Sequence, residues 1–230
     1  MFEFRFYEIW RESEYIERLI NGVFTSFWLT VLGSVVGFAF AILLAVSRRS
    51  HLGVLSWPAA IYVEVVRNTP LIVQLFFVAF GLPLLFDYRW PFEWSALLAL
   101  ALNFSAYYSE IIRAGLANLD PGQRESASAL GLTRPQCFAL VVLPQSLCKV
   151  YPSLVSQFIF LFLTTGIISE IGIEELTWSG RFIADRTFRD FEVYLVLTLL
   201  YVLLAISFRG FFALMARRIF PWQNLAGGRT

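Results

Sequence analysis

Two pairs of oppositely charged residues stand inside otherwise apolar stretches of this sequence. Glu64 and Arg67 are three residues apart, as are Glu110 and Arg113, so the members of each pair can meet on one face of a helix. Ionisable groups in apolar surroundings are costly, and by default they indicate a polar pathway or binding site. The alternative is that these pairs anchor helices at an interface or join one helix to another.

A further acidic residue, Glu170, lies near the end of a long apolar stretch, and two roles are open to it. Its carboxylate could pair with the ammonium or the basic side chain of a small solute, or it could stand at the outer water boundary. Thr164 and Thr165 precede it in the same stretch, where their hydroxyls could hydrogen-bond a zwitterion. These residue types suit binding of a polar molecule.

A helix break is expected at Thr69-Pro70, because proline lacks an amide N–H and disfavours helix at the residue before it. Backbone groups freed at membrane depth are tolerated where they line a cavity, so Thr69 and Gln74 are candidate lining residues. The full set of candidates for a polar pathway is Glu64, Thr69, Gln74, Ser105, Ser109, Thr164, Thr165, Ser169 and Glu170.

The sequence lacks the residues that most enzymes and metalloproteins need. His51 is the single histidine, and Cys137 and Cys148 are the two cysteines, in no metal-ligand spacing. A metal, haem or iron–sulfur site is therefore not expected, and the cysteines are predicted to be small packing residues. Neither a nucleophile set nor a Gly-x4-Gly-Lys-Ser/Thr phosphate loop is present. We expect no catalysis, so another chain must supply the energy for any driven work.

The composition places these residues in a membrane protein. Hydrophobic residues make up 58% of the 230 residues and charged residues 15%, and the mean hydropathy is +0.66. Soluble domains carry about 25% charged residues. The formal net charge of +1 also argues against nucleic-acid binding through bulk charge.

Long apolar runs predict the elements that position the polar residues. The expected spans cover about 19–47, 69–86, 94–112, 151–173 and 193–215, within a single domain of residues 1–230. Uncharged runs of this length indicate helices rather than barrel strands, so the fold class is an all-α membrane protein, a bundle of five transmembrane helices. Gly33 and Gly37 form a small-xxx-small pattern, which indicates close packing either within the chain or against another subunit.

The distribution of basic residues predicts the orientation. With five spans, eleven of the eighteen Lys and Arg residues fall on the side of the long 113–148 loop and seven on the other side. The more basic side is expected to be cytoplasmic, which puts the N-terminus outside and the C-terminus inside.

The 113–148 loop carries explicit helix-capping signals. Asp120-Pro121-Gly122-Gln123 places an acid at the N-cap and a proline at the first helical position, and the helix should end at Leu130, before Gly131. Thr133-Arg134-Pro135-Gln136 should start a second short helix that ends near Leu143-Pro144. Two short helices would form a protruding knob shaped to enter a groove of a partner. The alternative is a solvated surface loop.

The spacing in this loop resembles a known motif. The loop resembles the EAA loop of binding-protein-dependent ABC importer permeases, whose pattern is E-A-A-x3-G-x9-I-x-L-P. In this sequence the matching residues are Glu125-Ser126-Ala127, then Gly131 after three residues, Val141 after nine more, and Leu143-Pro144 after one more. Ser126 and Val141 depart from that pattern conservatively. The resemblance implies that the residues in contact with an ATPase are Glu125, Ser126, Ala127, Gly131, Leu143 and Pro144.

Two other stretches are similar to the polar amino acid branch of these permeases. They are Tyr62-Val-Glu-Val-Val-Arg67-Asn-Thr-Pro70-Leu-Ile-Val-Gln74-Leu and Ala106-Tyr-Tyr-Ser-Glu-Ile-Ile-Arg-Ala-Gly115, the second followed by Pro121-Gly122-Gln123. Where many relatives have Lys-Asp, this chain has Leu163-Thr164. That departure leaves the identity of the amino acid open.

The resemblance implies a division of labour among several subunits in a bacterial cytoplasmic (inner) membrane. This chain would pair with a second permease, a copy or a homologue, while two ATPase subunits that bind ATP and Mg dock on the loops. An external solute-binding protein would deliver the amino acid. The mixed-charge segment from Glu174 to Glu192 would be either the surface on which the solute-binding protein docks or simply a solvated loop. The alternative function is a secondary transporter or channel subunit, which would want more mid-membrane carboxylates or histidines.

Overall fold

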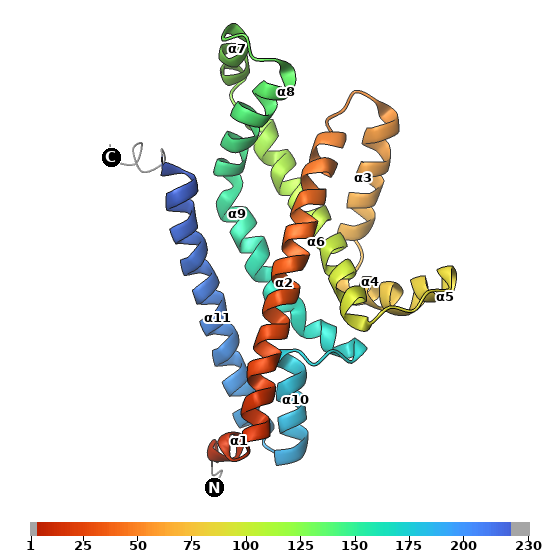
Figure 1. The fold of residues 1–230 in the computed structure, drawn as a ribbon, viewed down its shortest axis with the longest axis vertical. Coiled ribbons are helices and arrows are strands. Elements are labelled where there is room, and N and C mark those ends of the chain that lie inside the picture. Colours follow the sequence, from red (N-terminus) through yellow and green to blue (C-terminus); the bar gives the residue numbers. More distant parts are fainter. Residues whose placement is uncertain (1–3, 222–230) are drawn as a thin grey trace.

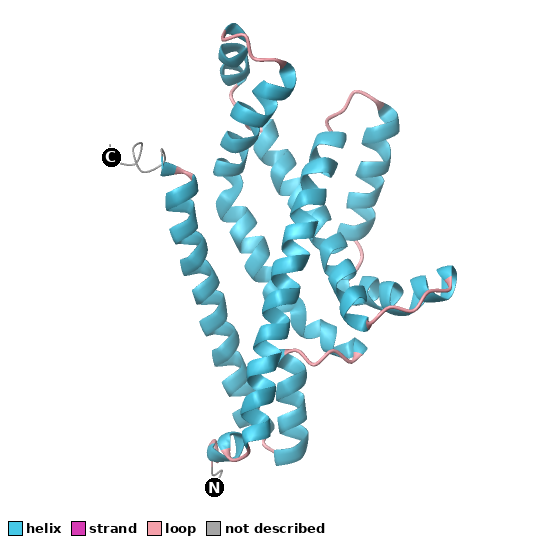
Figure 2. Cartoon of the chain, viewed as in Figure 1, coloured by secondary structure: helices cyan, strands magenta, loops and turns pink. Residues whose placement is uncertain are grey.

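The computed structural model describes residues 4–221, and this part of the chain is built from helices and contains no strand (Figure 2). The α-helices are α1 Tyr7–Trp10, α2 Ser13–Ser47, α3 Gly53–Arg67, α4 Leu71–Phe76, α5 Leu82–Phe86, α6 Phe92–Ala117, α7 Pro121–Ala129, α8 Arg134–Cys137, α9 Leu143–Thr164, α10 Leu176–Thr187 and α11 Asp190–Ile219. π-helical turns cover Phe77–Gly81 and Phe138–Val142, and a 3-10 helix covers Thr165–Ile171.

Five membrane spans result when a bent helix pair is counted as one. Four stretches are long and apolar enough to cross a membrane, and Gly53–Arg67 with Leu71–Phe86 forms a fifth that bends by 110°. The predicted second span, 69–86, covers only the second arm of this pair, because the helix from Gly53 to Arg67 before the break at Pro70 belongs to the same bent span. Helices α2, α6 and α11 begin before the ranges expected from hydropathy, because their first turns carry the charged residues Glu14, Glu93 and Asp190.

The helices form an elongated bundle whose two ends are built from different elements (Figure 1). The α7–α8 loop lies at one end, together with the connection between α2 and α3. Helices α1 and α10 lie at the opposite end, and α11 runs along one side. The first described helix and the last residues of α11 thus lie toward opposite ends. Arg229, which was counted on the more basic side together with the 113–148 loop, lies outside the described part of the chain.

Helices α2 and α6 pack closely along their length, because two glycines on α2 admit the backbone of α6. A Cβ atom added at Gly37 would lie 2.6 Å from Phe104 Cβ, and one added at Gly33 would lie 3.1 Å from Leu100 Cβ. The small-xxx-small pattern therefore serves packing within the chain. Phe104 itself is fully buried in the main apolar core.

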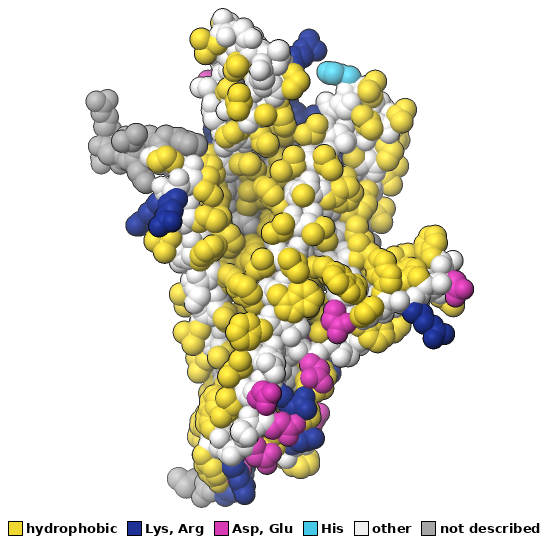
Figure 3. Space-filling model, in the orientation of Figure 1, with side chains coloured by type: hydrophobic (Ala, Val, Ile, Leu, Met, Phe, Trp, Pro, Cys, Tyr) yellow, Lys and Arg dark blue, Asp and Glu magenta, His cyan; other side chains and the backbone are white. Residues whose placement is uncertain are grey.

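The spans differ in how much of their surface the chain covers. In their most apolar windows, 67% of α6 is buried but only 22% of α11. Apolar side chains dominate the middle of the visible surface, while acidic and many basic side chains gather near the α1–α10 end (Figure 3). This distribution suits an apolar belt in contact with lipid or with other subunits. Both cysteines are free and buried, as expected of packing residues.

Candidate functional site

The protruding end of the molecule is organised by the capped helix α7. Asp120 accepts a hydrogen bond from the backbone amide of Gly122 at 2.9 Å, and Pro121 occupies the first turn. The chain then leaves α7 through Gly131, whose φ of 78° is left-handed. The amide of Leu132 donates to the Ala127 carbonyl at 3.2 Å and closes the last turn. These local bonds fix a short helix without help from another subunit.

Helix α7 presents one face to the core and the other to solvent. Ala127 is buried, in contact with the core cluster that includes Cys137 and Val142. Glu125, Ser126 and Gly131 are exposed. Leu130 is 82% exposed, although sequence reasoning singled it out only as a helix end. An exposed leucine beside exposed polar residues forms a compact patch that suits contact with a second protein.

The second short helix of the loop does not end near Leu143-Pro144, so that prediction is wrong. Helix α8 passes through the π-helical turn Phe138–Val142 directly into α9. Pro144 lacks the N–H that would continue the helical hydrogen bonding at this point, and the π-helical turn lies directly before it. Leu143 and Pro144 are half-buried at this junction. The loop is therefore rigidly continuous with a membrane span.

Two side-chain bonds connect the loop to the spans. Gln145 of α9 donates to Gln123 of α7 at 3.0 Å, and Lys149 of α9 donates to the carbonyl of Asn118 at the end of α6 at 3.0 Å. Thr133 and Gln136 form a capping box at the start of α8. A displacement of α7 would thus reach both α6 and α9.

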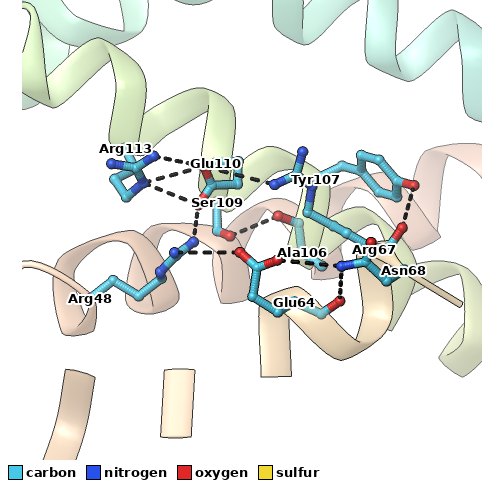
Figure 4. Close-up of polar contacts among 9 residues, drawn as sticks. All are labelled: Arg48, Glu64, Arg67, Asn68, Ala106, Tyr107, Ser109, Glu110 and Arg113. Atoms are coloured by element: carbon cyan, nitrogen blue, oxygen red, sulfur yellow. Dashed lines mark hydrogen bonds and ion pairs between the residues drawn. The ribbon is translucent and has the colours of Figure 1, made fainter. Parts of the chain in front are cut away.

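A network of five charged residues joins α2, α3 and α6 in the half of the bundle nearer the loop (Figure 4). Glu110 stands at its centre: it accepts from Arg48, forms a two-pronged pair with Arg113 at 2.9–3.3 Å, and lies 3.9 Å from Arg67. Its side chain is only 17% exposed. Arg48 also lies 4.0 Å from Glu64. Three guanidinium groups against two carboxylates leave one formal positive charge.

The two i,i+3 pairs expected from sequence behave differently. Glu110 and Arg113 do pair on α6. Glu64 instead faces Arg48 and accepts from the Asn68 side chain at 3.3 Å, while Arg67 turns to Glu110 and to the ring of Tyr107. Glu64 and Arg67 thus face separate partners on neighbouring helices, at 4.0 and 3.9 Å. The network thus joins one helix to another, as the alternative interpretation expected.

The helix break at Thr69-Pro70 is stabilised by Gln74. Its amide donates to the carbonyls of Val66 at 2.7 Å and Thr69 at 2.9 Å, and its oxygen accepts from Asn103 of α6 at 3.2 Å. Both ends of the Gln74 side chain are therefore engaged within this chain. Thr69 is half-buried, and its hydroxyl donates to the Val65 carbonyl.

The remaining pathway candidates lie at separate places in the bundle. Ser105 and Ser109 are fully buried on α6, where Ser105 also meets the Tyr62 hydroxyl at 2.8 Å. Thr164, Thr165 and Ser169 each donate to a carbonyl three residues earlier in the chain. Glu170 is half exposed and lies 3.4 Å from Arg181 of α10. Within this chain the nine candidates do not converge on one chamber.

Sequence reasoning missed a fully buried carboxylate near the α1–α10 end of the bundle. Glu175 was placed with Glu174 in a docking or solvated segment, but its side chain is fully buried at the start of α10. It accepts from the Trp178 amide at 2.8 Å, from Ser26 of α2 at 3.2 Å and from Tyr201 of α11 at 3.2 Å. Burial raises the pKa of the Glu175 carboxyl, and these hydrogen bonds offset part of the rise. No local spacing marked this burial, because the side-chain partners Ser26 and Tyr201 lie on other helices.

The comparison with known families decides the identity of the chain. Residues 20–221 match the family of binding-protein-dependent transport system inner membrane components. The chain belongs to this family. The permease is therefore a multi-pass membrane protein, and within the described residues no group of three or more His, Cys, Asp or Glu side chains could hold a metal ion.

Several characterised relatives match the permease over most of its length. The octopine transport system permease protein of Rhizobium radiobacter is 33% identical over 88% of this chain and 86% of its own. The arginine transport system permease protein ArtQ of Bacillus subtilis is 32% identical over 82% and 86%. The glutamine transport system permease protein of Escherichia coli is 31% identical over 89% and 94%.

Solved structures agree with the fold. The permease matches a chain in the crystal structure of an amino acid ABC transporter with histidines, at a TM-score of 0.82 and 32% identity, over 94% of this chain and all of that one. A chain of the MetNI methionine ABC transporter matches at a TM-score of 0.74 and 19% identity, over 90% and 99%, and supports the fold alone.

Proposed function

We propose that this permease is the transmembrane subunit of an ATP-driven importer of polar amino acids. The observation that carries the proposal is the exposed, self-capped helix α7, with its EAA-like residues, joined to a continuous membrane helix through Gln123 and Gln145. The octopine, arginine and glutamine permeases to which the chain is similar support the substrate class. A secondary transporter or channel subunit would leave this capped loop without a role.

The proposed assembly places the chemistry on other subunits. Two copies of an ABC ATPase bind ATP and Mg and dock on the loops of two permeases, either two copies of this chain or this chain and a homologue. A solute-binding protein delivers the amino acid. This chain itself binds no cofactor, metal or nucleic acid. The loop end faces the bacterial cytoplasm, with the N-terminus outside and the C-terminus inside.

The contacts suggest how ATP hydrolysis would drive transport. Closure of the ATPase pair moves α7, and the Gln123–Gln145 bond and the unbroken α8–α9 backbone carry this motion to the spans. Lys149 transmits it to the end of α6, where Glu110 connects to α2 and α3. The spans then alternate between outward- and inward-open arrangements.

The substrate path is proposed to lie between the two permeases, since the candidate residues do not converge within one chain. Glu64, Thr69 and Gln74 surround the helix break, Ser105 and Ser109 lie on α6, and Thr164, Thr165, Ser169 and Glu170 lie around the end of α9. Glu170 is half exposed, so its carboxylate can reach the ammonium or basic side chain of a passing amino acid.

Copurification tests whether an ATPase docks on the 113–148 loop, which we call the coupling loop. The tagged permease is purified from its native membrane in mild detergent, and its companions are identified by mass spectrometry. We expect an ATPase with a phosphate-binding loop in the wild type, and its loss in Leu130→Asp, which places a charge on the exposed α7 patch. The matched control is Val54→Asp, which changes an 86% exposed side chain at the start of α3. Recovery of the permease alone, or equal ATPase yield from both variants, would overturn the proposal.

A further inference from the structure

A large apolar cavity of the permease lies at the level of the membrane spans. It has a volume of about 760 Å³, within the ~300–1,000 Å³ range of ligand pockets, and it is enclosed by α2, α9 and α11 with Tyr108 of α6. Phe27 and Phe208 stack at one end of it. At the other end, Tyr151 packs against Phe220 and donates to the Phe212 carbonyl at 2.8 Å.

The lining suits a hydrocarbon chain and not an amino acid. Its polar groups are the hydroxyls of Ser34, Tyr108, Tyr151 and Ser207, of which Tyr151 and Ser207 donate to backbone carbonyls of α11. No carboxylate, guanidinium or amide side chain lines the cavity. The charged ends of a zwitterion would lose their hydration here without compensation. This cavity is therefore distinct from any path for a polar amino acid.

A basic residue stands where a lipid headgroup would lie. Phe211, Met215 and Ile219 line the cavity from α11, and Arg218 falls on the same helical face at the end nearer the coupling loop. Arg217 is one residue earlier and therefore about 100° around the helix, on a different face. Both arginines are exposed, and neither forms an ion pair with any described residue. Basic side chains are visible at this end of α11 in Figure 3.

We infer that this cavity, which opens as a groove between α2, α9 and α11, binds one anionic phospholipid of the leaflet nearer the coupling loop. An acyl chain fills the space between α2 and α11, and Arg218 pairs with the headgroup phosphate. In a bilayer the hydrophobic effect does not favour the groove over bulk lipid, because the two are equally apolar. The preference comes from filling a void beside α9 and from the charge of Arg218. The lipid would connect α11, which has little contact with α2, to the rest of the bundle.

Native mass spectrometry of the intact transporter complex tests this inference. The complex is stripped of lipid and titrated with phosphatidylglycerol or phosphatidylethanolamine. We expect one tightly held phosphatidylglycerol per copy of this chain, with binding weakened about fivefold in Arg218→Gln. Arg217→Gln is the matched control and should bind as the wild type does.

Three results would overturn the inference. The first is equal weakening by both variants, which would indicate general surface charge. The second is equal affinity for the two phospholipids, which would remove the role of the headgroup. The third is the absence of any retained lipid, as expected if a helix of a second permease fills the groove.

Discussion

The side chain of Gln74 donates to the carbonyl of Val66 at 2.7 Å, and this hydrogen bond replaces the one that Pro70 cannot make. Val66 lies four residues before Pro70, so an ordinary residue at position 70 would donate to it through its amide. Gln74 thus satisfies a carbonyl that the break exposes at membrane depth. This bond helps to stabilise the 110° bend in the span.

The first prediction follows from that bond. Gln74→Leu leaves the Val66 carbonyl with only the long 3.4 Å bond from the Thr69 amide and removes the acceptor of the buried Asn103 amide, and an unsatisfied buried group costs about 1–3 kcal/mol. We expect a lower melting temperature of the detergent-purified complex. Thr198→Val is the control, because this exposed hydroxyl only donates to the Tyr194 carbonyl of its own helix. Equal melting temperatures for the wild type and Gln74→Leu would refute the role of Gln74.

A second prediction concerns the centre of the charged network. Glu110→Gln removes the carboxylate that three arginines share, and breaking a buried pair on one side costs about 3–5 kcal/mol. Partial exposure of Arg67 and Arg113 places the expected loss at or below the lower end of that range. Glu64→Gln should cost less than about 1 kcal/mol, since Glu64 is 59% exposed. Thermal unfolding of both variants shows which one loses more stability. A larger loss in Glu64→Gln than in Glu110→Gln would show that Glu110 is not the centre of the charged network.

Gly131 provides a third prediction, which separates loop geometry from membrane insertion. A β-branched residue at its φ of 78° is strained by about 1–2 kcal/mol or more, so Gly131→Val should distort the exit from α7. We expect normal amounts of permease in the membrane but reduced ATPase copurification and uptake. Gly210→Ala, on α11 with no atom within 4 Å of the added Cβ, should leave all three unchanged. Full uptake by Gly131→Val would argue against coupling through this loop.

The buried carboxyl of Glu175 gives a pH dependence. Because burial raises its pKa in the folded state, the folded permease holds this proton more tightly than the unfolded chain does. The contribution of Glu175 to stability is therefore fully present below the ordinary pKa of a glutamate. It is lost as the pH rises through the raised pKa of the folded state. Glu175→Gln should remove this part of the pH dependence, while Glu174→Gln, 63% exposed, should keep it. Melting temperatures measured between pH 4 and 9 by about one-unit steps would reveal it. Parallel profiles for the wild type and Glu175→Gln would exclude Glu175 as the source.

The last prediction concerns substrate recognition at Glu170. If this carboxylate meets a basic or ammonium group, Glu170→Gln should raise the KM for a basic amino acid more than for an acidic one. Arg181→Gln, which removes its partner at 3.4 Å, should not reproduce that selectivity. Unchanged KM values in uptake assays would assign Glu170 to the water boundary.

Local chemistry in the sequence was sufficient for the helical class, the membrane location and the shape of the coupling helix. Apolar runs of span length demand helices in lipid whatever they pack against. The Asp120 cap and the Gly131 turn depend on atoms only a few residues apart, so their spacing predicted them. For the same reason the pairing of Glu110 with Arg113 was predictable.

Tertiary structure alone decided the features that depend on several helices meeting. Glu64 and Arg67 separate because Arg48 and Glu110 arrive from α2 and α6. The burial of Glu175 requires Ser26 and Tyr201, which are distant in the sequence. The continuity of α8 with α9 likewise depends on a π turn that Pro144 permits but does not require. Side-chain partners across helices follow from how the spans pack, and hydropathy along one chain carries no record of that packing.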